Sequence, residues 1–271
     1  MKKAFISIMM AVLSALGTYG SVITSFNFDS LTVGDTTTQL LEDDTGILDL
    51  SRGTSMGTSV YKDPLVVAGY GGSGSALYFT TAVNGGCIAL SGSATPCASV
   101  EKSTFTISAM INPEANPTGD YATLISLNEY SSNPQLYTYQ IRLQEVSGQL
   151  YLAAMFTDSS ANQVVFTNST AIALGSWSEI LVSHDADSNM LYLDVNGNRE
   201  SFSTPFDPTT DLIVRTFSLG SLRTYSNIYS NPYQGSIDNI VIDSAAIPEP
   251  ASMGLLLMGS CGLAVLRRVH R

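Results

Sequence analysis

The feature that most limits the fold of this chain is an alternation of apolar and polar residues with a period of two. Residues 105–111 read Phe-Thr-Ile-Ser-Ala-Met-Ile, and residues 137–143 and 191–195 follow the same pattern. Successive side chains of a β-strand point to opposite faces, so each segment is expected to be a strand with one buried face. Asn196-Gly197 lies between two such runs, and this dipeptide is the strongest short signal for a β-hairpin.

Further strands are expected along the whole body of the chain, from about residue 25 to residue 242. Segments of the right length and composition lie at residues 121–127, 150–156, 164–167, 179–183 and 216–219. Turn-forming Gly, Asn and Pro separate them, and no long apolar repeat with a helical period interrupts them. Many short strands at this spacing predict an all-β fold, either a sandwich or a barrel.

Six segments, in sequence order, resemble the concanavalin A-like, laminin G-like jelly roll. They are an early strand, a Gly-x-Ala-Leu-x-Phe strand, a Phe-Thr-Ile-Ser-Ala strand, a Leu-Ile-Ser-Leu segment, a Trp-led hairpin with Asn-Gly and a closing Gly-x-Ile-Asp strand, at residues 25–29, 74–79, 105–111, 124–127, 177–197 and 235–242. Met110 stands where the family usually has Trp, and His184 where it has Tyr. The resemblance implies a two-sheet antiparallel jelly-roll sandwich, and we assign it to a domain of residues 21–247.

The N-terminus has the organisation of a secretory signal peptide. Lys2 and Lys3 form a short basic region, residues 4–16 are almost wholly apolar, and Gly17 and Gly20 are small residues suited to cleavage. The apolar stretch is too short for a permanent membrane span. A basic start followed by apolar and then small residues is typical of a cleaved leader, so residues 1–20 are predicted to be a signal peptide.

The C-terminus combines a short apolar segment with a basic end. Its elements, in order, are Pro248, Glu249, Pro250, an apolar run at 253–266, Arg267 and Arg268. A helix over residues 251–266 would be about 24 Å long, whereas a bilayer core is about 30 Å thick, so it would be a marginal transmembrane anchor. The basic end is expected to remain on the cytoplasmic side.

This arrangement, over residues 248–271, resembles the PEP-CTERM sorting signal. The resemblance implies that an exosortase-type enzyme processes the tail after transient insertion into the inner membrane. The protein would then pass to the cell surface or the extracellular space of a Gram-negative bacterium, often one that makes exopolysaccharide. The alternative is an ordinary tail anchor in which Pro-Glu-Pro occurs by chance.

Charge narrows the range of partners. Residues 21–247 keep 7 of the 12 Lys and Arg and 22 of the 23 Asp and Glu, so this part of the chain has a net charge of −15. A nucleic-acid partner is disfavoured because phosphate binding requires a basic surface. Neutral glycans, cations and basic partners remain open, and so does the simpler explanation that the acidity keeps an exported protein soluble.

Two of the three cysteines lie in the predicted domain, and the third, Cys261, lies in the apolar tail. Cys87 and Cys97 are close together in a stretch rich in Gly and Pro. In an oxidising compartment they are predicted to form a disulfide. A bridge over a loop of this size would stabilise the fold by roughly 3 kcal/mol in the chain-entropy model.

No residue set in the sequence specifies a reaction. The Glu-x-Asp-x-x-Glu pattern of laminarinase-type glucanases is absent, so the same-face carboxylates of a retaining glycosidase are not expected. Gln140-Ile141-Arg142 comes nearest to the Gln-Ile-His strand of jelly-roll polysaccharide lyases, but the histidine is missing. His184 is the single histidine of the domain and is expected at a strand end without a catalytic role.

Calcium is the one cofactor that the sequence leaves open. Residues 185–189 read Asp-Ala-Asp-Ser-Asn and place oxygen atoms at alternate positions. Met190 and Asn196 occupy the positions at which an EF-hand loop has Gly and Glu. A polar hairpin turn explains the segment equally well, so no metal ligand and no cofactor is predicted.

The candidate ligand contacts are aromatic and amide side chains of a late loop, namely Tyr225, Asn227, Tyr229, Asn231 and Tyr233. Aromatic faces beside amides suit sugar stacking and hydroxyl recognition, although turn packing is the alternative. The sequence therefore predicts an exported, non-catalytic surface or matrix protein that binds a glycan such as exopolysaccharide or has a structural role. A protein-binding adhesion module and a polysaccharide-degrading enzyme are the alternatives.

Overall fold

The computed structural model describes most of the predicted domain. The described residues are 22–34, 41–42, 49–52, 64–80, 88–89, 104–128, 139–157, 163–204, 216–223 and 229–244. The predicted signal peptide, the predicted sorting segment, Cys87 and Cys97 lie outside these ranges. Within the described ranges, no helix is long and apolar enough to cross a membrane.

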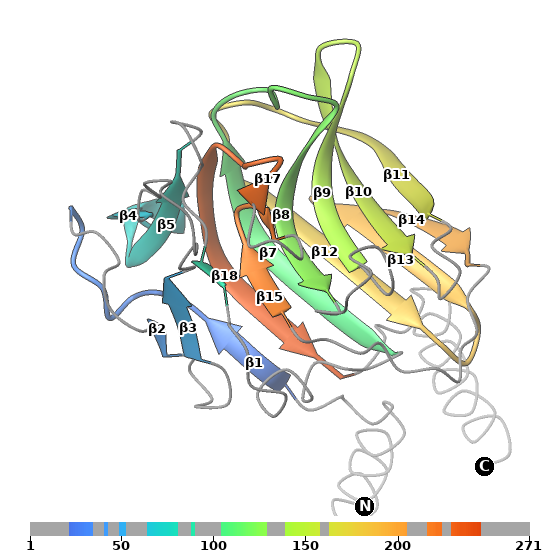
Figure 1. The fold of residues 1–271 in the computed structure, drawn as a ribbon, viewed down its shortest axis with the longest axis horizontal. Coiled ribbons are helices and arrows are strands. Elements are labelled where there is room, and N and C mark those ends of the chain that lie inside the picture. Colours follow the sequence, from blue (N-terminus) through green and yellow to red (C-terminus); the bar gives the residue numbers. More distant parts are fainter. Residues whose placement is uncertain are drawn as a thin grey trace, which may run out of the picture.

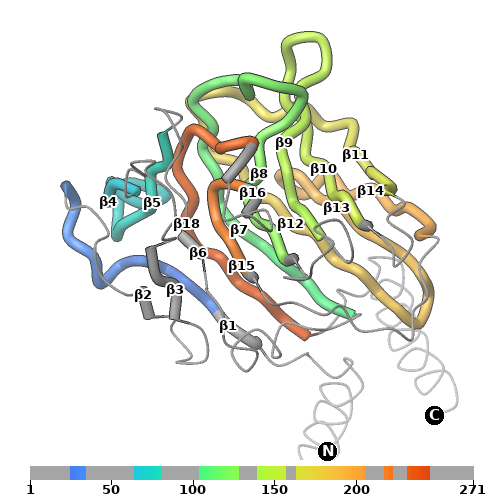
Figure 2. The backbone as a smooth tube through the Cα atoms, viewed as in Figure 1, coloured from blue at the N-terminus to red at the C-terminus, as the bar shows by residue number. Residues whose placement is uncertain are grey.

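The first of two large sheets contains eight of the strands in the described residues. Figure 1 shows it behind the second sheet, and its strand order is β14 (Asn198–Ser203), β13 (Met190–Val195), β12 (Ser178–Asp185), β7 (Phe105–Pro113), β18 (Gly235–Asp243), β5 (Ser75–Phe79) and β4 (Leu65–Ala68). The eighth strand, β1 (Val22–Phe26), pairs antiparallel with β18, and Figure 2 shows these two strands side by side. The structure thus pairs the early strand with the closing strand, and β1 spans residues 22–26 where the sequence placed the early strand at 25–29.

The second sheet also contains eight strands of the described chain. Its order is β11 (Gln163–Ile172), β10 (Gln149–Thr157), β9 (Tyr139–Val146), β8 (Tyr121–Asn128), β15 (Thr216–Leu219), β6 (Ile88–Ala89), β3 (Asp49–Arg52) and β2 (Leu41–Glu42). A small two-stranded ribbon, β16 (Leu222–Arg223) and β17 (Tyr229–Ser230), follows β15 along the chain. Neighbouring strands in both sheets run antiparallel, as in β9–β10 and β7–β12.

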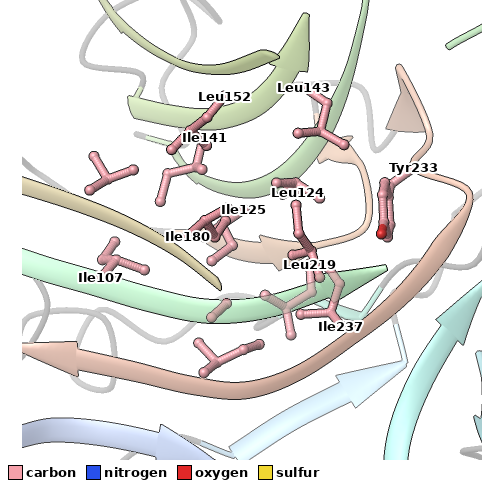
Figure 3. Close-up of a cluster of buried hydrophobic side chains, with 14 of the residues drawn as sticks. Ile107, Leu124, Ile125, Ile141, Leu143, Leu152, Ile180, Leu219, Tyr233 and Ile237 are labelled. Carbon is pink, nitrogen blue, oxygen red and sulfur yellow. The ribbon is translucent and has the colours of Figure 1, made fainter. Parts of the chain in front are cut away.

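Apolar side chains from both sheets fill the space between them. Figure 3 shows Ile107 of β7 and Ile180 of β12 opposite Ile141 of β9 and Leu152 of β10, and all four are at least 97% buried. Ile107 and Ile141 are apolar members of the period-two segments, and Leu152 and Ile180 lie in two of the further predicted strands. The prediction of an all-β, two-sheet antiparallel sandwich is confirmed, and the arrangement is consistent with a jelly roll.

The predicted Asn-Gly hairpin joins β13 to β14. Asn196 and Gly197 both have positive φ, 52° and 83°, as a type I′ turn requires. The Gly197 backbone N–H donates to Asp194 Oδ1 at 2.8 Å, which closes the turn. The local sequence therefore fixes the register of this strand pair.

A β-bulge in β8 determines which side chains of that strand face outward. The register against β9 shifts between Thr123 and Ile125, so Leu124 and Ile125 both enter the core although they are consecutive. Thr123 pairs with Arg142 and Ser126 pairs with Gln140 on the opposite face. The bulge thereby keeps polar residues of β8 in line with polar residues of β9.

Candidate functional site

The outer face of the second sheet carries a set of polar side chains that we call the polar strip. On β9 the residues Gln140, Arg142 and Gln144 alternate with the core residues Ile141 and Leu143. Because partners in register share a sheet face, the neighbouring strands add their own polar residues to the same surface. The polar strip consists of Ser218 on β15, Thr123 and Ser126 on β8, and Gln140, Arg142 and Gln144 on β9.

Three members of the polar strip are buried and keep an atom without a hydrogen-bond partner. Thr123, Gln140 and Arg142 have only 0%, 1% and 6% of their surface exposed. Thr123 Oγ1, Gln140 Oε1 and Arg142 Nε have no partner in the structure. Most buried polar groups in folded proteins are paired, so three such atoms on adjacent strands make this face a candidate binding site.

Arg142 is held in place mainly by uncharged groups. Its Nη2 donates to Gln144 Oε1 at 3.0 Å, and its Nη1 faces Met155 Sδ at 3.6 Å. The guanidinium carbon lies 4.2 Å from the centre of the Tyr121 ring, which is a cation–π contact. Burial lowers the pKa of Arg142, opposed by Tyr121 and Asp120, but a guanidinium remains protonated in proteins.

The β15 end of the polar strip is internally satisfied. Ser218 Oγ donates to the backbone carbonyl of Ser221 at 2.8 Å, and the Ser126 and Ser218 hydroxyl oxygens lie 2.5 Å apart. Since Ser218 uses its proton on Ser221, Ser126 donates to Ser218. The atoms of the polar strip that are free to bond a ligand therefore belong to Thr123, Gln140 and Arg142.

The loop predicted to contact ligand is described only in part. Tyr225 and Asn227 lie outside the described residues, and of Tyr229 only the backbone, in β17, is described. Asn231 has a positive φ of 50°, and its carbonyl accepts the Thr123 backbone N–H at 2.9 Å. The backbone next to β17 therefore lies beside the polar strip.

Tyr233 has a structural position instead of the exposed one expected for a ligand contact. Its side chain is 1% exposed, and its hydroxyl donates to the Ser236 carbonyl at 3.1 Å. Figure 3 shows the ring lying with the core residues. Tyr233 is two residues before Gly235 and four before Ile237, so it shares the core-facing period of β18, and this was the signal for its burial.

Two other segments considered for chemistry also have defined positions. His184 lies in β12 next to its last residue, 5% exposed, with Nε2 3.2 Å from Thr204 Oγ1. Asp185 Oδ1 accepts the Asp187 N–H at 3.0 Å and Asp185 Oδ2 accepts the Ser188 hydroxyl at 2.6 Å, which is the polar-turn arrangement. Within the described residues, no group of three or more His, Cys, Asp or Glu is placed to hold a metal ion.

The polar strip was not among the predicted sites, although its pattern is present in the sequence. Taken alone, Gln140-Ile141-Arg142 resembles only an incomplete lyase motif. Continued to Gln144, the same alternation puts three long polar side chains on one face of a strand whose other face is core. Their burial depends on the tertiary structure and could not be predicted from one strand.

Comparison with known families agrees with this architecture. Residues 89–250 match the laminin G model of the concanavalin A-like lectin/glucanases superfamily. The match spans more than half of the chain, and the chain belongs to this superfamily. A comparison with curated protein sequences found no match.

Several solved structures share the fold at low sequence identity. Domain 4 of AbnA, a GH43 extracellular arabinanase from Geobacillus stearothermophilus solved in complex with arabinotriose, is 18% identical with a TM-score of 0.57, over 85% of this chain and 96% of that one. NanB sialidase from Streptococcus pneumoniae is 12% identical with a TM-score of 0.51, over 65% of this chain and 26% of that one. At these identities the likeness shows the fold alone.

Proposed function

We propose that this chain is an exported, non-catalytic protein that binds a glycan on the outer face of its second sheet. The observation that carries the proposal is the buried polar strip with its three unpartnered atoms, Thr123 Oγ1, Gln140 Oε1 and Arg142 Nε. Sugar hydroxyls both donate and accept hydrogen bonds. A glycan could therefore satisfy the amide oxygen, the hydroxyl and the guanidinium N–H at the same time.

Aromatic side chains border the polar strip and suit the same ligand class. Tyr121 and Tyr151 are half-buried, and each pairs in register with Gln144 at one end of the strip. Tyrosine combines an apolar ring face with a polar hydroxyl, which fits the two kinds of surface of a sugar ring. Tyr225, Asn227, Tyr229 and Asn231 are proposed as additional contacts, since the Asn231 carbonyl bonds to Thr123.

Two further considerations support a binding role. The domain of AbnA with which this chain shares its fold was solved with bound arabinotriose. The side chains of the polar strip carry hydroxyl, amide and guanidinium groups. Retaining or inverting hydrolysis uses a pair of carboxylates, and no member of the strip carries one. We therefore propose recognition without turnover, and without a required calcium ion.

The test removes unpartnered atoms at nearly constant volume. Thr123→Val and Gln140→Met are expected to weaken glycan binding about tenfold, while the free energy of unfolding stays the same or rises by about 1 kcal/mol. The rise is expected because a buried orphan group costs free energy in the unliganded protein. Binding of the full-length protein would be measured on arabinotriose, dextran, polygalacturonate and the producing cell's exopolysaccharide, with calcium or with a chelator.

A matched control exists on the first sheet. Thr106 Oγ1 donates to Ser183 Oγ at 2.8 Å on the outer face of that sheet, away from the polar strip. Thr106→Val is expected to leave glycan affinity unchanged. Failure to bind any member of the panel, or equal affinity of the Thr123 and Gln140 variants and the natural protein, would reject the proposed function.

Export and sorting form the second part of the proposal. We propose that residues 1–20 are removed on secretion, and that an exosortase-type enzyme removes the tail that follows Pro248-Glu249-Pro250 on the way to the cell surface. Mass spectrometry of surface-associated protein should then find no peptides from residues 4–16 or 253–266. Replacing Pro248 and Pro250 with alanine is expected to hold the protein in the membrane fraction. Surface protein that retains both ends would contradict this route.

A further inference from the structure

Arg142 is a buried positive charge that forms no ion pair with a described residue, and Asp120 acts on it only at longer range. Its side chain is 6% exposed, and its contacts are an amide oxygen, a thioether and an aromatic ring. Arg199 gives the contrast within the same chain, because it forms an ion pair with Asp194 at 3.3 Å although both side chains are more exposed. Arg199 therefore has a carboxylate in direct contact, whereas Arg142 has none in contact among the described residues and interacts only at longer range with Asp120.

A buried guanidinium of this kind leaves the site electrostatically incomplete. Buried charges are normally paired, and a lone buried charge usually loses its charge by a pKa shift. Arginine cannot take that route, because its guanidinium stays protonated in proteins. An anion would therefore gain more at this position than at a solvated arginine.

Gln144 occupies the place where such an anion would bind. Its Oε1 accepts from Arg142 Nη2 at 3.0 Å, as one oxygen of a carboxylate would. Gln144 is only half-buried and lies toward the end of β9, so its side chain can turn away without disturbing the core. The adjacent Nε has no partner, which leaves the guanidinium edge ready for a second oxygen.

Building on the glycan-binding function proposed above, we propose that the ligand is an acidic polysaccharide whose anionic group replaces Gln144 on Arg142. Hydroxyl groups of the same sugar would then reach Gln140 Oε1 and Thr123 Oγ1, which lie next to Arg142 on β9 and β8. The anionic group is a carboxylate or a sulfate ester, both of which present paired oxygens to a guanidinium.

Because the domain is strongly acidic, the attraction for an anionic ligand is confined to Arg142, and the dependence of affinity on salt is expected to be unusual. Residues 21–247 carry −15, so the protein as a whole repels a polyanion. Salt at about 0.15 M screens exposed charges beyond about 8 Å but screens a buried contact much less. Affinity is therefore expected to hold or rise as salt is added, unlike the steep loss seen when a polyanion binds a basic surface.

The experiment compares each acidic polymer with its neutral counterpart. Full-length protein would be titrated with polygalacturonate and carboxyl-reduced polygalacturonate, and with dextran sulfate and dextran. We expect at least tenfold tighter binding to the charged member of one pair, and that pair identifies carboxylate or sulfate as the anion. Equal affinity for charged and neutral polymers would overturn the inference while leaving glycan binding intact, whereas no binding to the wider panel would reject both.

Two variants tie the preference to Arg142. Arg142→Met removes the charge at similar volume and is expected to weaken binding of the charged polymer at least tenfold without lowering Tm, because a buried unpaired charge stabilises little. Gln144→Glu supplies an internal carboxylate to Arg142, so it is expected to raise Tm. It is also expected to weaken binding of the charged polymer at least tenfold, as Arg142→Met does. Gln163→Glu, an exposed change on β11, is the matched control and should leave affinity unchanged. Unaltered affinity in Gln144→Glu would overturn Arg142 as the anchor even if Arg142→Met does not fold.

Discussion

Replacing Gly235 with alanine is expected to lower the free energy of unfolding by about 3 kcal/mol or more. Gly235 opens β18 with a φ of 142°, a backbone conformation that favours glycine. A Cβ at this position would lie 2.2 Å from the Asn112 carbonyl oxygen and 2.6 Å from the Tyr233 hydroxyl. The carbonyl belongs to β7, which is paired with β18 at this point, so it cannot move without breaking the centre of the first sheet.

Gly197→Ala is the matched control for this change. Gly197 also has a positive φ, 83°, but a Cβ there would have no atom within 4 Å. In Gly197→Ala the free energy of unfolding is therefore expected to fall only by the cost of the left-handed backbone conformation, about 1–2 kcal/mol. Urea unfolding of the three proteins would measure the difference, and equal losses in the two variants would show that the clash with β7 is relieved at little cost.

The sequence predicts the strands because the core lies on one face of each sheet. The segment 216–219 is predicted from residue composition and is found with the same limits as β15. β11 is longer than predicted because its polar residues are internally bonded. Asn168 is fully buried and its amide donates to the Leu193 carbonyl at 3.0 Å, so the strand continues through a position that lacks an apolar side chain.

A period-two pattern does not predict which side chains point inward where the backbone departs from regular pairing. In β8 the bulge puts Leu124 and Ile125 into the core together, and no alternation predicts two consecutive inward residues. The same bulge aligns Thr123 with Arg142 on the outer face. The part of the candidate site that crosses from β8 to β9 was therefore not predictable from either strand alone.

Burial of the polar strip was the second feature that the sequence could not provide. Alternation assigns Gln140 and Arg142 to the outer face of a strand, and an outer face is normally solvated. The structure instead leaves 1% and 6% of these side chains exposed. Which parts of the chain cover a sheet face is decided by tertiary packing, so the site became recognisable only from burial and unpartnered atoms together.

Tyr139→Phe is expected to stabilise the protein by about 1–2 kcal/mol, although it removes a polar group from the core. Tyr139 is 1% exposed, and its hydroxyl has no hydrogen-bond partner. Its ring packs against Phe105 and Phe156 at centroid distances of 4.9 Å and 4.7 Å, and phenylalanine keeps both contacts. The substitution therefore removes the desolvation cost of an orphan hydroxyl without leaving a large cavity.

Tyr233→Phe makes the same chemical change with the opposite expected sign. The Tyr233 hydroxyl donates to the Ser236 carbonyl, so its loss is expected to destabilise the fold by about 1 kcal/mol. Denaturant unfolding at neutral pH would measure both variants. A loss of stability in Tyr139→Phe would contradict the prediction and would mean that the hydroxyl has a partner, such as a buried water molecule.

Alkaline unfolding gives an independent check on Tyr139. Burial raises the pKa of the Tyr139 hydroxyl well above its usual value, so the folded protein keeps a proton that the unfolded chain releases above about pH 10. Stability is therefore fully present below that pH and falls as the pH rises further. Tyr139→Phe removes this contribution, so its stability should decline less steeply above about pH 10 than that of the natural protein. Parallel curves for the two proteins would show that Tyr139 ionises as readily when folded as when unfolded, and would contradict its burial.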